Sequence, residues 1–144
     1  MYNTAEQYMM ASKARTFFDG DSIGKILASD NPKEQKALGR KVKDFDPDEW
    51  NRVAKKFVFI GNYAKFTQDE DLKKILLATM GTTLVEASPF DKIWGIGMKE
   101  DDPLALDRKT WNGTNWLGEV LTQVRDHIYH EGILSNIDFT TIYQ

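Results

Sequence analysis

Signals for the start of a helix recur along this chain, and they constrain its fold more than any other feature. Thr4 and Gln7 have the spacing of a capping box. Asn31–Pro32 and Asp46–Pro47 each place a capping side chain directly before a proline that suits the first helical turn. Apolar residues at helical spacing follow these signals. We therefore expect a chain built mainly from helices.

The same signals set the expected boundaries of these helices. The helix after Asp46 is the best supported, because Trp50, Phe57 and Gly61 share one stripe at 3.6-residue spacing. Thr67 is expected to cap the helix that follows. The predicted helices cover residues 4–18, 23–28, 31–39, 46–65, 67–80 and 115–132.

Three segments do not show this helical pattern. Thr83–Ala87 is short and strand-like, and residues 101–110 suit one helical turn. The tail 133–144 is rich in β-branched residues, which suits either an added strand or an irregular segment. We predict one α+β domain over residues 1–132, mostly helical with a few short strands, followed by this tail.

Composition narrows the classes of function. The chain has 144 residues, of which 41% are hydrophobic, enough for one domain with a sizeable core. It has no cysteine, which excludes disulfides and a thiolate nucleophile. The formal net charge of -3 gives no field that attracts nucleic acid in general. Neither a membrane-spanning run nor a signal-peptide pattern is present, so we expect a soluble, cytoplasmic protein without a membrane partner. We read no oligomeric state from the sequence.

The loop at residues 88–98 holds the most unusual combination of residues in the chain. Asp91 precedes Trp94, and Gly95 and Gly97 follow the tryptophan closely. An acid beside a flat aromatic ring, on backbone that glycine permits, suits recognition of a planar base joined to a sugar. The alternative is that Trp94 fills the core and Asp91 forms a turn, and the residues alone favour neither interpretation.

Glu6 is a second candidate, in the first turn of the first predicted helix. The helix dipole and the unpaired N–H groups there favour a charged carboxylate, which can stabilise a developing cation. Propensity alone favours the simpler interpretation of a good first-turn residue. Met10 and Lys13 share the face of Glu6. Lys13 is either a partner for a phosphate or carboxylate, or a side chain that snorkels from an ordinary amphipathic face.

Further polar residues lie at the ends of predicted helices. Arg40 and Lys65 complement the helix dipole, although an arginine fork also suits a phosphate. Asn115 starts the last long helix, where free N–H groups make a candidate anion site. His127 and His130 are three residues apart without a third ligand, so we predict a solvated helix face and no metal site.

Several short motifs follow one another in a fixed order along the chain, at residues 2–10 with Lys13, 37–40, Trp50, 64–66, 76–79, 84–88, 91–97 and 115–118. This order resembles that of the YbiA-like, or NADAR, family of N-glycosidases. The resemblance covers roughly Tyr2 to Arg125.

The resemblance implies a small α+β fold and hydrolysis of a bond between ribose C1 and nitrogen, without a cofactor. The associated substrates are ribosylamino-pyrimidine phosphates of riboflavin synthesis, and ADP-ribose linked to guanine in nucleic acid. By position, the catalytic acid of the family falls on Glu6, and we group Asp91 with it as catalytic. The residues expected to bind substrate are Tyr8, Lys13, Arg40, Lys65, Trp94, Gly95 and Asn115.

One departure from the family pattern concerns the start of the chain. Members usually have a strand and loop before the helix that carries the acid, whereas here Met1 almost adjoins Glu6. We expect that strand to be missing or replaced, with the tail 133–144 as a candidate replacement. Two other functions stay open: a non-catalytic module that binds ADP-ribose or NAD-type ligands, and a purely structural interaction protein.

Overall fold

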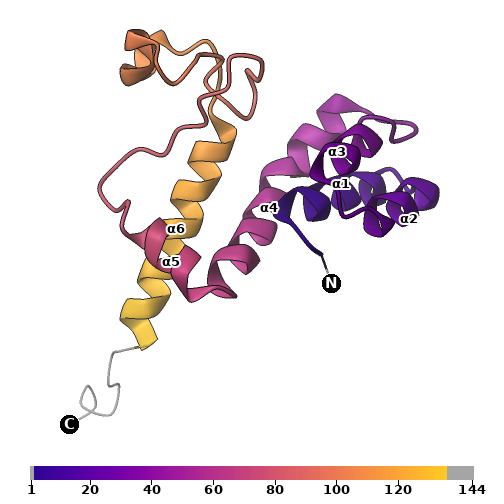
Figure 1. Ribbon diagram of the computed structural model, residues 1–144, viewed down its shortest axis with the longest axis horizontal. Coiled ribbons are helices and arrows are strands. Elements are labelled where there is room, and N and C mark those ends of the chain that lie inside the picture. The colour runs from indigo at the N-terminus through magenta and orange to yellow at the C-terminus, as the bar shows by residue number, and fades with distance from the viewer. Residues whose placement is uncertain (1, 136–144) are drawn as a thin grey trace. The chain divides into compact units, whose positions relative to one another are not determined.

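The computed structural model describes residues 2–135, and the chain divides into two compact units, Met1–Lys65 and Phe66–Gln144. Figure 1 shows the helices coloured along the chain. The α-helices are α1 (Ala5–Thr16), α2 (Gly20–Ala28), α3 (Pro32–Gly39), α4 (Pro47–Thr67), α5 (Glu70–Leu77) and α6 (Trp116–Ser135). Two short 3-10 helices, η1 (Pro103–Leu106) and η2 (Arg108–Thr110), lie between α5 and α6.

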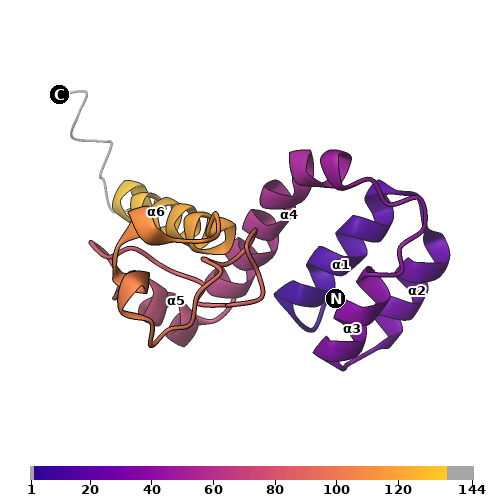
Figure 2. The ribbon, with the colours of Figure 1, turned by 90° about the horizontal axis from the view of Figure 1, so that it is seen from above.

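In the first unit, α1, α2 and α3 pack against one another (Figures 1 and 2). Met10, Ala11 and Ala14 of α1 form a buried cluster with Ile26 and Val42. The two alanines let the helices approach closely, and full burial of a side chain such as Ile26 contributes about 2 kcal/mol.

The predicted starts of three helices are confirmed. Thr4 Oγ1 accepts a hydrogen bond from the backbone N–H of Gln7 at 2.9 Å. Asn31 Oδ1 accepts from the N–H of Lys33 at 2.9 Å, and Asp46 Oδ1 from that of Asp48 at 2.8 Å. These bonds satisfy N–H groups that the helix itself leaves unpaired.

The apolar stripe predicted for α4 faces aromatic residues within the first unit. The Tyr8 ring lies edge-on to Phe57 at 6.5 Å, and Trp50 stacks on Phe57 at 6.1 Å between ring centroids. A Cβ on Gly61 would come within 2.8 Å of the Tyr8 ring. Gly61 therefore permits the close approach of Tyr8 to α4.

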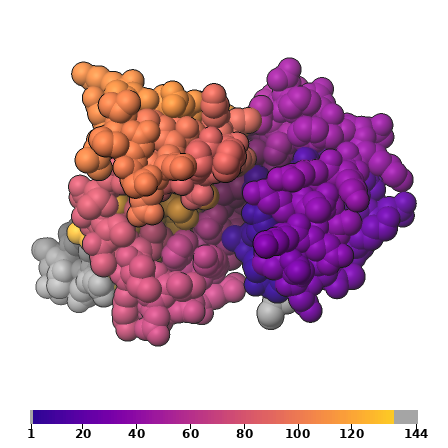
Figure 3. All heavy atoms as spheres, turned by 45° about the horizontal axis from the view of Figure 1, so that its top comes forward, coloured from indigo at the N-terminus to yellow at the C-terminus, as the bar shows by residue number. Residues whose placement is uncertain are grey.

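In the second unit, α5 packs against α6. Val120, Val124 and Ile128 are buried along one face of α6, and Leu76 of α5 is buried as well. Figure 3 shows part of the segment between these helices at the surface, drawn in pink to orange, whereas Ile96 and Met98 within this segment are buried.

The predicted cap of α5 is wrong. Thr67 is the last residue of α4, and the capping side chain is Asp69. Asp69 Oδ1 accepts hydrogen bonds from the N–H groups of Asp71 and Leu72, both at 3.0 Å. The Asp69 carboxylate is a better acceptor for these amides than the Thr67 hydroxyl, because a negative charge is favourable at the N-terminal end of a helix.

The α+β prediction is also wrong, because residues 2–135 contain helices and no strand. Thr83–Ala87 is irregular, since its polar backbone atoms find partners outside any sheet. Asn115 Nδ2 donates to the carbonyl of Leu84 at 2.9 Å, and the Glu86 N–H donates to Asn115 Oδ1 at 3.0 Å. An asparagine side chain thus takes the place of a neighbouring strand.

Several other predicted boundaries also differ from the observed ones, since α2 begins at Gly20 rather than at residue 23 and α5 ends at Leu77 rather than at residue 80. The first helix ends at Thr16 rather than Phe18, and α6 continues past Gly132 to Ser135. A Cβ on Gly132 would meet nothing within 4 Å, and the residue does not have a positive φ, so this glycine does not act as a stop. The strand considered for the tail falls, from residue 136 onward, outside the described residues.

Candidate functional site

Glu6 is half-buried in the first turn of α1, as predicted. Its neighbour Gln7 is only 2% exposed and fixes this turn. Gln7 Nε2 donates to the carbonyls of Ile26 at 3.0 Å and Ser29 at 3.1 Å, and Gln7 Oε1 accepts from the N–H of Asn3 at 2.8 Å. The backbone that carries Glu6 is therefore tied to the end of α2.

Gln35 extends this buried network from α3. Its Nε2 donates to the Ser29 carbonyl at 2.6 Å and to Asn3 Oδ1 at 3.1 Å. Thr4 Oγ1 donates to Gln35 Oε1 at 3.2 Å. Gln35 was not predicted from the sequence, although its spacing of three residues from Leu38 places an amide on the apolar side of its helix.

Lys13 rests against an aromatic ring rather than extending into solvent. Its Nζ lies 3.7 Å from the centroid of the Phe45 ring, a distance that suits a cation–π interaction. Burial lowers the pKa of Lys13 from its usual value. This contact gives Lys13 a structural role, and its contact with a substrate stays a prediction.

Met10, on the predicted face of Glu6, and Tyr8, which is expected to bind substrate, both pack within the first unit. Met10 belongs to the buried cluster, and a Cβ on Gly39 would clash with the Met10 side chain. The glycine before Arg40 therefore lets α3 approach α1. Tyr8 packs on α4 and meets the Tyr2 ring edge-on at 5.0 Å, so it does not share the face of Glu6.

The two remaining basic candidates of the first unit lie at helix ends. Arg40 is exposed at the C-cap of α3, where its N–H donates to the Lys36 carbonyl at 3.2 Å. Lys65 is exposed in the last turn of α4, and it has an interaction partner. Both positions complement a helix dipole.

In the second unit, Asp91 forms a turn that presents Trp94. Asp91 Oδ1 accepts hydrogen bonds from the N–H groups of Ile93 at 3.0 Å and Trp94 at 2.8 Å. The half-buried Trp94 ring meets the Trp116 ring edge-on, with centroids 5.5 Å apart and planes at 89°. Trp94 is neither fully buried nor free to rotate without disturbing Trp116.

The start of α6 is bonded to this loop. The N–H groups of Asn115, Trp116 and Leu117 donate to the carbonyls of residues 95, 93 and 94 at 3.0–3.1 Å. The N–H of Thr114 donates to the Lys92 carbonyl at 2.9 Å. The amides that suggested an anion site are therefore already paired with the loop.

Gly95 and Asn115 are both buried, and both serve the packing of this loop. A Cβ on Gly95 would come within 2.8 Å of the Asp91 carbonyl and 2.9 Å of that of Glu86. Asn115 is 2% exposed, with its side chain bonded to the 84–86 segment. Their contact with substrate stays a prediction.

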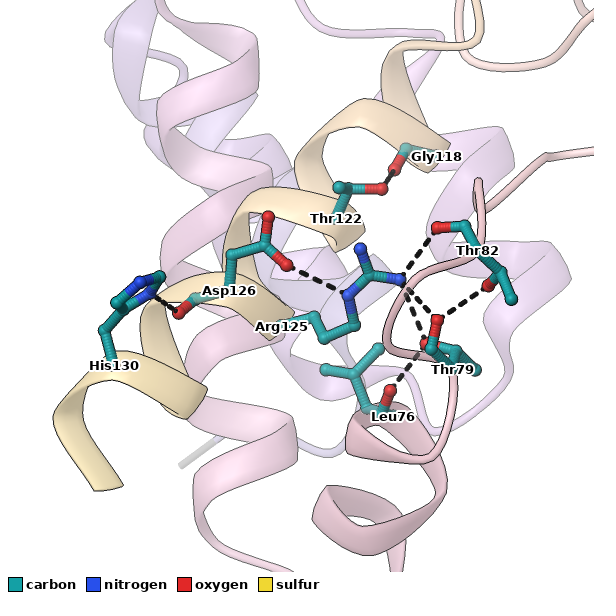
Figure 4. Close-up of polar contacts among 8 residues, drawn as sticks. All are labelled: Leu76, Thr79, Thr82, Gly118, Thr122, Arg125, Asp126 and His130. Atoms are coloured by element: carbon teal, nitrogen blue, oxygen red, sulfur yellow. Dashed lines mark hydrogen bonds and ion pairs between the residues drawn. The ribbon is translucent and has the colours of Figure 1, made fainter. Parts of the chain in front are cut away.

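Arg125, a buried side chain of α6 with several hydrogen bonds, was not predicted from the sequence (Figure 4). Its Nη1 donates to the carbonyls of Thr79 at 2.8 Å and Thr82 at 3.0 Å, and its Nε donates to Asp126 Oδ1 at 3.0 Å. Arg125 is 4% exposed. It ties the segment after α5 to α6, which no local sequence signal indicates.

The histidines of α6 have partners of their own. His127 Nε2 lies 3.3 Å from Glu131 Oε1, and His130 Nδ1 lies 2.6 Å from the Asp126 carbonyl oxygen. Among residues 2–135, no group of three or more His, Asp or Glu side chains is arranged to hold a metal ion. In the same part of the chain, no helix combines the length and apolar character needed to cross a membrane.

Comparison with known proteins identifies the family. The chain matches the NADAR domain over residues 1–129 and therefore belongs to the NADAR family. It is 42% identical to the protein irg-1 of Caenorhabditis elegans over 130 residues, covering 89% of this chain and 61% of that protein. It is 44% identical to N-glycosidase R617 of Acanthamoeba polyphaga mimivirus over 125 residues, covering 87% of this chain and 74% of that protein.

The name of a further relative refers to riboflavin biosynthesis. The chain is 32% identical to the chloroplastic riboflavin biosynthesis protein PYRR of Arabidopsis thaliana over 119 residues, covering 80% of this chain and 18% of that protein. The NMR structure of the E. coli protein YbiA is similar in fold, with a TM-score of 0.71 and 26% identity over 90% of this chain and 68% of that one.

Proposed function

We propose that this protein is an N-glycosidase that hydrolyses the bond between ribose C1 and a nitrogen atom of a heterocycle. The observation that carries the proposal is the NADAR match over residues 1–129, which includes every candidate site residue from Glu6 to Asn115. The name N-glycosidase of the mimivirus relative, which is 44% identical, supports the same activity.

In the proposed reaction, Glu6 acts on the charge that develops at C1. Breaking the C1–N bond gives the ribose oxocarbenium character, which a nearby carboxylate stabilises. Water adds its hydroxyl to C1, and its proton passes to the leaving nitrogen. Glu6 suits this role because the buried Gln7 amide fixes its turn, and fixed geometry favours catalysis.

Asp91 and Trp94 suit recognition of the sugar and the base. Asp91 Oδ1 holds two backbone N–H groups, which leaves the second oxygen of the carboxylate for a ribose hydroxyl or the attacking water. The Trp94 ring, supported at its edge by Trp116, suits stacking on a base or sugar. Gly95 keeps the backbone beside this ring compact.

The basic residues are proposed to bind the phosphate of the substrate. Arg40 offers a fork of donors, whereas Lys13 and Lys65 offer single ammonium groups. Binding a group remote from the reacting bond positions C1 and so contributes to the rate. Tyr8 is proposed to line the same site, although its ring packs on α4.

A ribosylamino-pyrimidine phosphate of riboflavin synthesis is the substrate class that the name of the PYRR relative favours. ADP-ribose linked to guanine offers the same ribose, phosphate and nitrogenous ring. Both classes contain the C1–N bond on which the proposed reaction depends, so a direct comparison is required.

The test is a paired hydrolysis assay on the ribosylamino-pyrimidine phosphate and on DNA that carries ADP-ribosylated guanine. Each reaction is run beside a protein-free control, which measures spontaneous hydrolysis. Release of ribose phosphate or of ADP-ribose above this control supports an N-glycosidase and identifies its substrate class. Binding of either compound without release would contradict the proposal and favour the non-catalytic binding module.

A further inference from the structure

Both polar atoms of the Asn115 side chain form hydrogen bonds with the backbone. Nδ2 donates to the Leu84 carbonyl at 2.9 Å, and Oδ1 accepts from the Glu86 N–H at 3.0 Å. The residue is 2% exposed, which leaves little of its surface to a ligand. This arrangement fixes the 84–86 segment beside α6.

The backbone of Asn115 is bonded to the other side of the same loop. Its N–H donates to the Gly95 carbonyl at 3.0 Å, while the Ile96 N–H donates to the Glu86 carbonyl at 2.9 Å. Asn115 therefore binds both segments that flank Asp91 and Trp94, residues 84–86 through its side chain and Gly95 through its backbone. Removing the Asn115 side chain would break the bonds to residues 84–86 and weaken the backbone bond to Gly95.

The identity of residue 115 follows from its backbone and from its neighbours. Its φ of 55° lies in the left-handed region, which asparagine adopts more readily than most residues. A Cβ on Gly118 would clash with the Leu84 carbonyl and with the Asn115 amide itself. Gly118 thus leaves the space in which the Asn115 side chain reaches Leu84.

From these contacts, and resting on the proposed N-glycosidase function, we infer that Asn115 is a positioning residue for Asp91 and Trp94. It holds the loop through the backbone on both flanks, so that the Asp91 turn and the Trp94 ring keep one orientation. It differs in this from a residue that binds substrate directly. A displacement of about 1 Å at a reacting group is enough to lower a rate about 100-fold.

Two variants of Asn115 test this inference. Asn115→Gly accepts the left-handed backbone but loses both side-chain hydrogen bonds. Asn115→Asp keeps an acceptor for the Glu86 N–H and loses the donor to Leu84. We expect kcat/KM for the ribosylamino-pyrimidine phosphate to fall at least about tenfold in the glycine variant and by an intermediate factor in the aspartate variant.

The matched control is Thr79→Val in the same unit. The Thr79 hydroxyl also takes part in two hydrogen bonds, donating to the Leu76 carbonyl at 2.6 Å and accepting from Arg125 Nη1 at 3.3 Å. The control should lower the melting temperature while kcat/KM, measured per folded protein, stays at the wild-type value.

The second readout is NMR of the Trp94 indole and of the amides of residues 92–97, which needs no turnover. We expect these signals to shift in both Asn115 variants and to stay in place in Thr79→Val. Wild-type kcat/KM in a folded Asn115→Gly protein would overturn the inference. A fall in kcat/KM with unshifted loop signals would also overturn it, because Asn115 would then contact the substrate itself.

These readouts separate the inference from the proposed function. A wild-type protein that hydrolyses neither substrate would contradict the N-glycosidase proposal. The positioning of Trp94 would then be judged by the spectra alone, where shifted loop signals in Asn115→Gly support it and unshifted signals overturn it.

Discussion

Gly118 shows how one missing side chain permits a contact between distant parts of the sequence. In an isolated helix, alanine would be more stable than glycine by about 1 kcal/mol. At position 118, however, a Cβ would clash with the Leu84 carbonyl and the Asn115 amide. Overpacking of this kind costs about 1–3 kcal/mol, so the clash outweighs the helix propensity.

We therefore predict that Gly118→Ala lowers the free energy of unfolding by up to about 2 kcal/mol, the overpacking cost less the gain in helix propensity. Urea denaturation measures the change. The control is Gly132→Ala on the same helix, where a Cβ would meet nothing within 4 Å and the free energy of unfolding should rise by about 0.5–1 kcal/mol. Equal stabilisation by both substitutions would contradict the packing that we describe around Leu84.

Some site residues can be predicted from their local sequence, whereas others cannot. Glu6 and Trp94 were singled out because their local contexts, a first helical turn and a glycine-containing loop, are visible in the sequence. Gln35 and Arg125 were not, because their partners lie far away in the chain. A buried polar residue is recognisable only once its partners are known.

At the scale of elements, Asp19 connects three parts of the first unit. It caps α2, and its Oδ2 accepts from the Ser22 hydroxyl at 2.6 Å and from the Lys43 N–H at 3.0 Å. The Lys43 backbone amide, followed by the Ser22 hydroxyl and amide, lowers the pKa of Asp19 to about 2. The charged form is therefore the one that stabilises the folded protein.

A pH dependence follows from this lowered pKa. The pKa of an unfolded aspartate is about 3.9, so the contribution of Asp19 is fully present above that pH and is lost as the pH falls towards about 2. We predict that Asp19→Asn is less stable than wild type at pH 7, with a gap that narrows between pH 4 and pH 2. Denaturation midpoints across this range measure it.

The control for this prediction is Asp21→Asn, two residues away. Its carboxylate is 76% exposed and pairs only loosely with Lys43, at 3.4 Å, so its removal should change stability little at any pH. If the difference in stability between wild type and Asp19→Asn were as large at pH 2 as at pH 7, the stabilising role of the charged Asp19 carboxylate would be contradicted.

Helices were predictable at the scale of elements, whereas the strand was not. The caps at Thr4 and Asn31 lie within three residues of the amides that they bind, so the sequence alone indicates them. Thr83–Ala87 has the composition of a strand, but its backbone is paired by Asn115. A pairing across about 30 residues leaves no periodic signal, and tertiary contacts override the weak strand propensity.

At the scale of the whole molecule, family membership supports the proposed function more strongly than the composition does. The match covers residues 1–129, and the chain spans 61% and 74% of the irg-1 and R617 proteins. The net charge of -3 provides no general attraction for polyanions, so the proposed recognition of a phosphate would depend on individual cations such as Arg40. The proposed role of Glu6 as the catalytic acid rests on the family resemblance, since propensity favours an ordinary first-turn residue.

The most direct test of the account is the turnover of Glu6→Gln on whichever substrate the paired assay identifies. Glutamine keeps the shape of the side chain but removes its charge, so we predict that kcat falls roughly 10²- to 10⁴-fold while the melting temperature changes little. The control is Glu49→Gln, an exposed acid in the first turn of α4, which should keep wild-type turnover. A folded Glu6→Gln protein with wild-type turnover would contradict the assignment of Glu6 as the catalytic acid.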